Sequence, residues 1–129
     1  MGQTQLLLVV LGLMLIGIAI YVGVSMFSAN AVEDTRNAII VDLQNFATRA
    51  NAYYWRPVAQ GGGGKSFNDI TLARIYPMAE NLNARYAIES ADADECVIAG
   101  VGKIVTTNGD SIRVRIRVTT QRNIVEILN

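Results

Sequence analysis

LLLVVLGLMLIGIAIYVGVSMF, residues 6–27, is the stretch of sequence that decides how the rest of the chain is interpreted. It contains no charged residue, and Leu, Ile, Val and Phe fill 14 of its 22 positions. On a membrane-insertion scale this composition favours the bilayer by about −6 kcal/mol. As a helix the stretch would be about 33 Å long, close to the ~30 Å thickness of the hydrocarbon core. We therefore expect residues 6–27 to form a helix that can span a membrane.

The five residues before this stretch, MGQTQ, do not resemble the start of a cleaved export signal. They carry no Lys or Arg, whereas a secretory signal begins with a basic segment. The first charged residues after the stretch are Glu33, Asp34 and Arg36. Because no basic residue flanks the stretch closely, the positive-inside rule predicts no orientation in the membrane.

The composition of the whole chain excludes several functional classes. About a hundred residues remain outside the apolar stretch, which is enough for one small domain. Eleven basic and eleven acidic residues with no His give a formal charge of zero, so no nucleic-acid partner is expected. A single Cys, Cys96, cannot form an intrachain disulfide or a zinc site alone. The absence of His removes the usual catalytic triads. We expect neither an enzyme nor a cofactor.

The helical pattern continues beyond Phe27 but becomes amphipathic. Apolar residues recur at steps of three and four or their sums, with charged residues mostly between them. The residue before a proline is biased away from the helical conformation, so Pro57 sets the expected end of the helix near Tyr54 to Arg56. The residues expected to pack this half of the helix onto a sheet are Val32, Ile39, Leu43, Phe46, Ala50 and Tyr54.

Residues 57–83 are expected to connect the helix to the sheet. The four glycines Gly61–Gly64 predict a flexible surface loop. Residues 69–83 predict a short helix or an irregular segment that Pro77 interrupts. Leu72, Ile75, Met78 and Leu82 recur at helical spacing in this segment and are expected to face inward.

From Ala84 onward the apolar pattern alternates, as it does in strands. Residues 85–89, 95–107, 111–120 and 123–128 are four strand candidates, and Asn108-Gly109 between two of them is a strong hairpin signal. The predicted fold class is α+β: one long N-terminal helix, apolar in its first half, packs its second half on a C-terminal antiparallel sheet of about four strands. The expected regions are 1–28, 29–56, 57–83 and 84–129.

The third strand candidate places Arg113, Arg115 and Arg117 on one face and aliphatic residues on the other. One interpretation is a basic stripe for nucleic acid or an acidic partner. The other is the exposed outer face of a half-buried strand, with acidic residues of the next strand or of another subunit as partners. The neutral charge of the chain and the lack of aromatic residues among the arginines favour the second interpretation. Cys96 is expected to be a small buried apolar residue.

This layout resembles a type IV pilin or pilin-like filament subunit. The resemblance covers the whole chain as architecture, whereas the family's residue motifs lie only near the N-terminus, where the sequence resembles a divergent bacterial branch. It implies a helical homopolymer built from subunits drawn out of the cytoplasmic membrane by a pilus assembly machinery. The residues that it assigns to the polymerisation helix are Leu6, Leu7, Val10, Leu13, Gly17, Ile20, Val24 and Phe27.

The resemblance also assigns an inter-subunit contact to Met1 and Gln5. In type IV pilins a prepilin peptidase cuts after a glycine, and the fifth mature residue is usually a glutamate that pairs with a neighbour's terminal amine. If Met1 is the mature start, Gln5 holds the fifth place. Its side-chain oxygen can accept a hydrogen bond from that amine but cannot form the ion pair. If cleavage follows Gly2, the fifth residue is Leu7.

The expected function is that of a major pilin at the cell surface, in an extracellular filament for adhesion or for contact with surfaces or cells. One alternative is a minor pilin or a type II secretion pseudopilin. An alternative from another class is a single-pass membrane-anchored binding module that does not polymerise.

Overall fold

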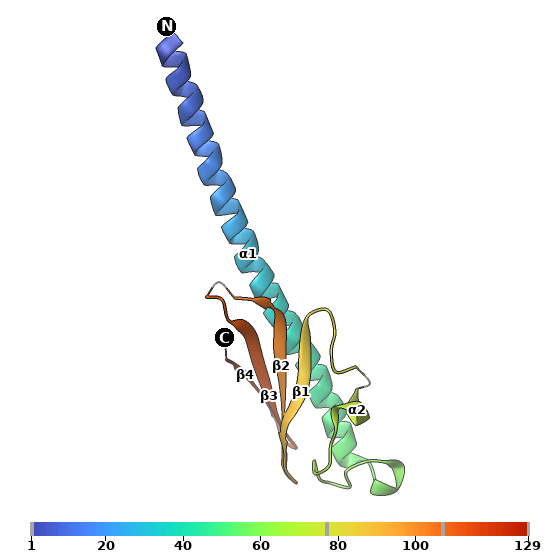
Figure 1. Ribbon diagram of the computed structural model, residues 1–129. Helices are drawn as coiled ribbons and strands as arrows, with labels where there is room; N and C mark the ends of the chain where they lie inside the picture. Colours follow the sequence, from blue (N-terminus) through green and yellow to red (C-terminus); the bar gives the residue numbers. More distant parts are fainter. Residues whose placement is uncertain (1, 77, 107, 129) are drawn as a thin grey trace. The chain divides into compact units, whose positions relative to one another are not determined.

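The structure is a computed structural model that describes residues 2–76, 78–106 and 108–128. Its first and longest element is the helix α1, Gly2–Trp55. Two short helices follow, η1 (Val58–Gln60) and α2 (Leu72–Ile75). The chain then forms the strands β1 (Ala84–Ala91), β2 (Glu95–Val105), β3 (Ser111–Thr119) and β4 (Asn123–Ile127) (Figure 1). The α+β class predicted from the sequence is therefore confirmed.

The chain divides into two compact units, Met1–Ala31 and Val32–Asn129. The first unit consists of the apolar part of α1. The second unit contains the rest of α1, the connecting segment and the sheet.

The sheet of the second unit is antiparallel, with its four strands in the order β1-β2-β3-β4. Gly109 has a φ of +90° in the β2–β3 hairpin, a conformation that favours glycine. Along β3 the side chains alternate as the sequence pattern predicted, with Ile112, Val114, Ile116 and Val118 fully buried. The three arginines between them lie on the opposite face.

The amphipathic part of α1 packs on the inner face of this sheet, as Figure 1 shows. Ile39 lies against two glycines of β2 at the centre of the contact. A Cβ atom added at Gly100 would lie 3.0 Å from Cγ2 of Ile39, and one at Gly102 would lie 3.2 Å from its Cδ1. The two glycines therefore allow the helix to approach the sheet more closely than any other residue would.

The four-glycine stretch, for which the composition predicted a flexible surface loop, folds back on the end of α1, and Gly62 is buried. The backbone N–H of Gly63 donates to the carbonyl of Tyr53 at 2.9 Å, and that of Gly64 to Arg56 at 3.0 Å. Lys65 donates in the same way to Tyr54 at 2.7 Å. Carbonyls in the last turn of a helix have no partner within the helix, so the loop satisfies them.

Part of the expectation for residues 69–83 is wrong. Ile75 is buried and Leu72 is half-buried against the core, but Met78 is exposed and Leu82 is 94% exposed. The described residues after α2 are not helical, so helical spacing no longer decides which side chains face inward. Instead, the backbone of Glu80 forms an isolated antiparallel β-bridge with Arg85 near the start of β1.

Candidate functional site

The surface formed by residues 6–27 of α1 is apolar, and its side chains are exposed apart from a half-exposed Gly12. We call it the apolar surface. The residues assigned to polymerisation lie on it; Leu6 is 67% exposed and Phe27 is 76% exposed. The helix is long and apolar enough to cross a membrane, with a mean hydropathy of 2.8 in its most apolar window. A surface of this kind is not stable in water, because each Leu or Ile left exposed forgoes roughly 1.5–3 kcal/mol of burial.

The N-terminal contact is expected to involve Met1 and Gln5. Gln5 lies in the first turns of α1, and its side chain is exposed. Met1 lies outside the described residues.

The helix residues expected to pack on the sheet are placed as follows. Val32, Ile39, Leu43, Phe46 and Ala50 are buried. Tyr54, in contrast, is only half-buried, and the fully buried aromatic residue of the last turn is Tyr53. The step of three from Ala50 keeps Tyr53 on the buried stripe, where its hydroxyl donates to the carbonyl of Asn68 at 3.4 Å. The sequence pattern also missed two small buried residues of the same stripe, Thr35 and Ala47.

The outer face of the sheet carries the three predicted arginines, and acidic residues of β1, β2 and β4 pair with two of them. Arg115 lies 3.2 Å from Glu126 of β4 and 3.4 Å from Glu89 of β1. Arg117 lies 2.9 Å from Glu95 of β2 and 3.7 Å from the same Glu126. Arg113 is exposed and has no ion pair with any described residue. The face is therefore largely neutralised rather than a basic stripe.

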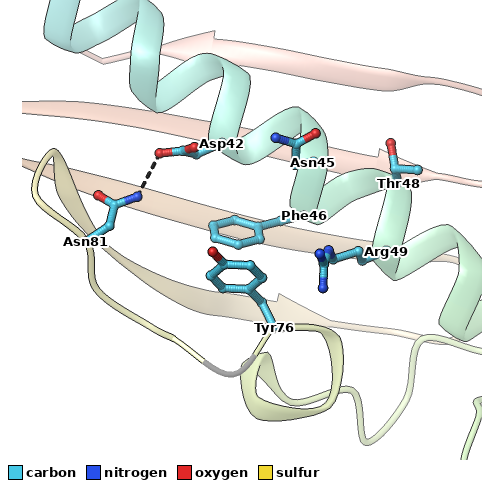
Figure 2. A pocket seen from close by; sticks show the side chains of 7 residues that line it. All are labelled: Asp42, Asn45, Phe46, Thr48, Arg49, Tyr76 and Asn81. Carbon is cyan, nitrogen blue, oxygen red and sulfur yellow. Dashed lines mark hydrogen bonds between the residues drawn. The ribbon is translucent and has the colours of Figure 1, made fainter.

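A polar pocket of about 350 Å³ lies between α1 and the segment that follows α2 (Figure 2). We call it the Asp42 pocket. Its lining residues are Asp42, Asn45, Phe46, Thr48, Arg49, Tyr76 and Asn81. The four polar residues that α1 contributes to it are Asp42, Asn45, Thr48 and Arg49. The rings of Phe46 and Tyr76 form its apolar wall, with their centroids 5.0 Å apart.

Asp42 joins three elements at one end of this pocket. Its Oδ2 accepts hydrogen bonds from Nδ2 of Asn81 at 2.8 Å and from the hydroxyl of Tyr86 at 2.5 Å. Oδ1 of Asn81 accepts in turn from the backbone N–H groups of Asn83 and Ala84. Burial, together with the Asp42 carboxylate, raises the pKa of Tyr86 well above its usual range. The Tyr86 hydroxyl therefore stays protonated at neutral pH and acts as a donor that holds β1 to α1.

Arg49 occupies the other end of the Asp42 pocket. It lies over the ring of Tyr76, with the guanidinium carbon 4.9 Å from the ring centroid. It also donates to the carbonyl of Ile75 at 3.2 Å, which holds α2 against α1. The pocket thus presents a carboxylate and a guanidinium that are not paired with each other, a composition suited to binding a polar group.

Two further observations bear on chemistry in the described part of the chain. No group of three or more Cys, Asp and Glu residues there is placed to hold a metal ion. Cys96 is fully buried, and burial raises the pKa of its thiol to about 11. Because the thiolate is the reactive form, this cysteine is a poor nucleophile at neutral pH.

Comparisons with protein-family models, with curated proteins and with solved structures found no match to this chain.

Proposed function

We propose that this chain is a major structural subunit of an extracellular type IV pilus-like helical filament, and that it polymerises through the apolar surface. The observation that supports this proposal most directly is the exposure of residues 6–27, which are uncharged, mostly apolar and, apart from the half-exposed Gly12, all exposed. The α+β architecture, a long N-terminal helix followed by a four-stranded antiparallel sheet, is also the one that such subunits have.

The physical argument concerns what can cover the apolar surface. Before assembly, lipid chains surround it; afterwards, the same surfaces of neighbouring subunits replace the lipid. The hydrophobic free energy of the two states is similar, because lipid chains are as apolar as Leu side chains. The helix satisfies its backbone groups internally in both environments. Head-to-tail contacts of this kind do not close, so repetition of one contact generates a helical filament.

In this proposal the sheet and the connecting segment form the outside of the filament. Adhesion and contact with surfaces or cells would then depend on polar features of the second unit, such as the Asp42 pocket and the outer face of the sheet. Residues 6–27 would have no role in recognition.

The experiment is a shear fractionation of cells that express the full chain, followed by electron microscopy and antibody labelling. The proposal expects filaments in the sheared fraction that carry this chain along their whole length. Labelling at the filament tip alone would support a minor pilin or pseudopilin instead.

The competing function is a single-pass membrane-anchored binding module, which the length and hydropathy of α1 also favour. In that case the chain stays in the membrane fraction after shearing and remains monomeric when detergent extracts it. A sheared fraction without any filament that contains this chain would overturn the filament proposal.

A further inference from the structure

Beside the Asp42 pocket lies a second, smaller pocket that is lined by three arginines and by no acidic residue. Its volume is about 180 Å³, and its lining residues are Arg49, Ala52, Tyr53, Arg56, Arg74 and Ile75. We call it the arginine pocket. It shares Arg49 with the Asp42 pocket.

Two elements bring the three arginines together. Arg49 lies on α1, and Arg56 directly follows the last residue of that helix, with its backbone N–H donating to the carbonyl of Ala52 at 3.1 Å. Arg74 comes from α2, which is held on α1 by the buried side chain of Ile75. Nη1 of Arg74 lies 3.4 Å from the hydroxyl of Tyr53, which directs the guanidinium toward the helix.

The positive charge in this pocket is not neutralised by the described part of the chain. None of the ion pairs between described residues includes Arg49, Arg56 or Arg74; these pairs involve Arg36, Arg85, Lys103, Arg115 and Arg117. The three like charges line one pocket and face no described carboxylate, so they repel one another to the extent that salt does not screen them. A bound anion relieves that repulsion.

Within residues 2–76, 78–106 and 108–128, few groups accept hydrogen bonds from the three arginines. A guanidinium has five N–H donors. Arg49 uses one on the carbonyl of Ile75, and Arg74 uses one on Tyr53. The carbonyls of Tyr53, Tyr54 and Arg56 at the end of α1 already accept from Gly63, Gly64 and Lys65, so they do not compete for these donors.

From this arrangement we infer that the arginine pocket binds a small dianionic oxyanion, either free phosphate or a terminal phosphate monoester. Guanidinium groups match phosphate oxygens through pairs of parallel N–H donors, and three of them supply more positive charge than a monoanionic carboxylate can balance. The pocket is too small for a polymer backbone, and the neutral chain has no extended basic surface to hold one. This inference goes beyond the proposed filament, because it concerns the Val32–Asn129 unit alone.

The test uses the full chain in detergent micelles and titrates it with inorganic phosphate, monitored by calorimetry and by the NMR signals of the arginine Nε–H groups. We expect saturable binding in the millimolar range or tighter, with shifts at Arg49, Arg56 and Arg74. Acetate and dimethyl phosphate, both monoanions, should bind at least about tenfold more weakly. If the natural ligand is a phosphate monoester, glycerol 3-phosphate should bind with an affinity similar to that of phosphate. If glycerol 3-phosphate does not bind, the natural ligand is free phosphate.

Three variants make the test specific. Arg74→Gln and Arg56→Gln should each weaken phosphate binding about tenfold, and Arg56→Lys should restore only part of it because the forked donor geometry is lost. Arg122→Gln is the matched control: Arg122 is exposed, pairs with no described acidic residue and lies outside the pocket. Circular dichroism establishes that each variant is folded. An equal loss in Arg122→Gln, or no saturable binding up to about 50 mM phosphate, would overturn the inference.

Discussion

The hydroxyl of Tyr86 donates a 2.5 Å hydrogen bond to the carboxylate of Asp42 and so connects β1 to α1 across 44 positions of sequence. Asp42 has no cationic partner among the described residues; its other hydrogen bond comes from the neutral amide of Asn81. The half-buried carboxylate is therefore stabilised by two neutral donors, and the removal of either donor should have a measurable effect.

Tyr86→Phe should destabilise the protein by about 2 kcal/mol at pH 7, because a hydrogen bond to a charged group is lost while the aromatic ring remains. The ring contact with Phe46, 4.7 Å between centroids, is available to Phe as well. Urea denaturation of the full chain in detergent, followed by circular dichroism, measures the difference. Asn81→Ala should act in the same direction, since it removes the second donor. A Tyr86→Phe protein as stable as the wild type would show that the bond contributes nothing to folding.

The same pair predicts how stability depends on pH. The pKa of Tyr86 is raised in the folded state, first by burial and then by the hydrogen bond to Asp42, from a usual value of 10.0. A raised pKa contributes stability that is fully present below the unfolded pKa and is lost as pH rises above it. The difference between wild type and Tyr86→Phe should therefore be constant from pH 7 to about pH 10 and shrink above it. A difference that grew above pH 10 would contradict this assignment.

The contact between Ile39 and the glycines of β2 predicts a coupled pair of substitutions. Gly100→Ala adds a Cβ 2.9 Å from Cε1 of Tyr86 and 3.0 Å from Cγ2 of Ile39, so it should cost about 1–3 kcal/mol. In an Ile39→Ala background one of these contacts is gone, and the cost of Gly100→Ala should fall. A double-mutant cycle measured by urea denaturation gives the coupling. Gly12→Ala, where no atom lies within 4 Å, is the control that leaves the sheet untouched.

The elements of this fold follow from local patterns, so the sequence predicts them well. Residues 6–27 lack charge, the strands alternate, and Asn108-Gly109 marks a hairpin; each of these signals concerns neighbouring residues. The prediction for Met78 and Leu82 is wrong because helical spacing was extended past the end of α2. Tyr53 and Tyr54 are adjacent aromatic residues, and the pattern alone does not decide which of them is buried.

The two pockets could not be predicted, because their residues meet only through tertiary packing. Asp42 and Asn81 are 39 positions apart, and the bond between them depends on how the chain returns to α1 after α2. Arg49 and Arg56 have a visible helical spacing, but Arg74 joins them only because Ile75 docks α2 on α1. Among the outer arginines, the sequence suggested acidic partners without identifying Glu89, Glu95 and Glu126.

The fold-back of the glycine loop predicts that Gly62 does not accept a side chain. A Cβ at Gly62 would lie 2.3 Å from the carbonyl oxygen of Arg56, and the backbone cannot move without breaking the cap on α1. Gly62→Ala should therefore cost about 3 kcal/mol or more. Gly61→Ala is the control: its φ is +82° but no atom lies within 4 Å, so only the conformational cost of about 1–2 kcal/mol applies. Thermal denaturation measures the stability of both variants. A Gly62→Ala protein as stable as the Gly61→Ala protein would contradict the proposed packing of the glycine loop on the end of α1.

The ion pairs on the outer face predict a small effect that depends on salt. Arg115→Gln removes the contacts with Glu89 and Glu126, but these side chains are about one-third to one-half exposed, so the cost should stay below about 1 kcal/mol. It should vanish near 1 M salt, where the screening length is only about 3 Å. Arg113→Gln, which breaks no ion pair between described residues, should have no effect at either salt concentration. The midpoints of urea unfolding, measured for each variant at low and high salt, test this prediction. An effect of Arg115→Gln that persisted at 1 M salt would rule out an electrostatic origin.

Val10→Lys should separate polymerisation from membrane anchoring. The substitution costs about 3 kcal/mol at the centre of a membrane helix, less than the roughly 6 kcal/mol by which the stretch favours the bilayer, so the chain should still insert. Within a filament, however, the same charge would be buried among neighbouring helices with no partner, and assembly should be lost. Val41→Lys is the matched control, because Val41 is 55% exposed against 53% for Val10 but lies on the polar side of the amphipathic half of α1. The filament proposal expects Val10→Lys in the membrane fraction without filaments, and Val41→Lys with normal filaments. If the chain is a membrane-anchored module, the two variants should not differ in binding or in localisation. Filaments built from the Val10→Lys chain would exclude the apolar surface as the polymerisation interface.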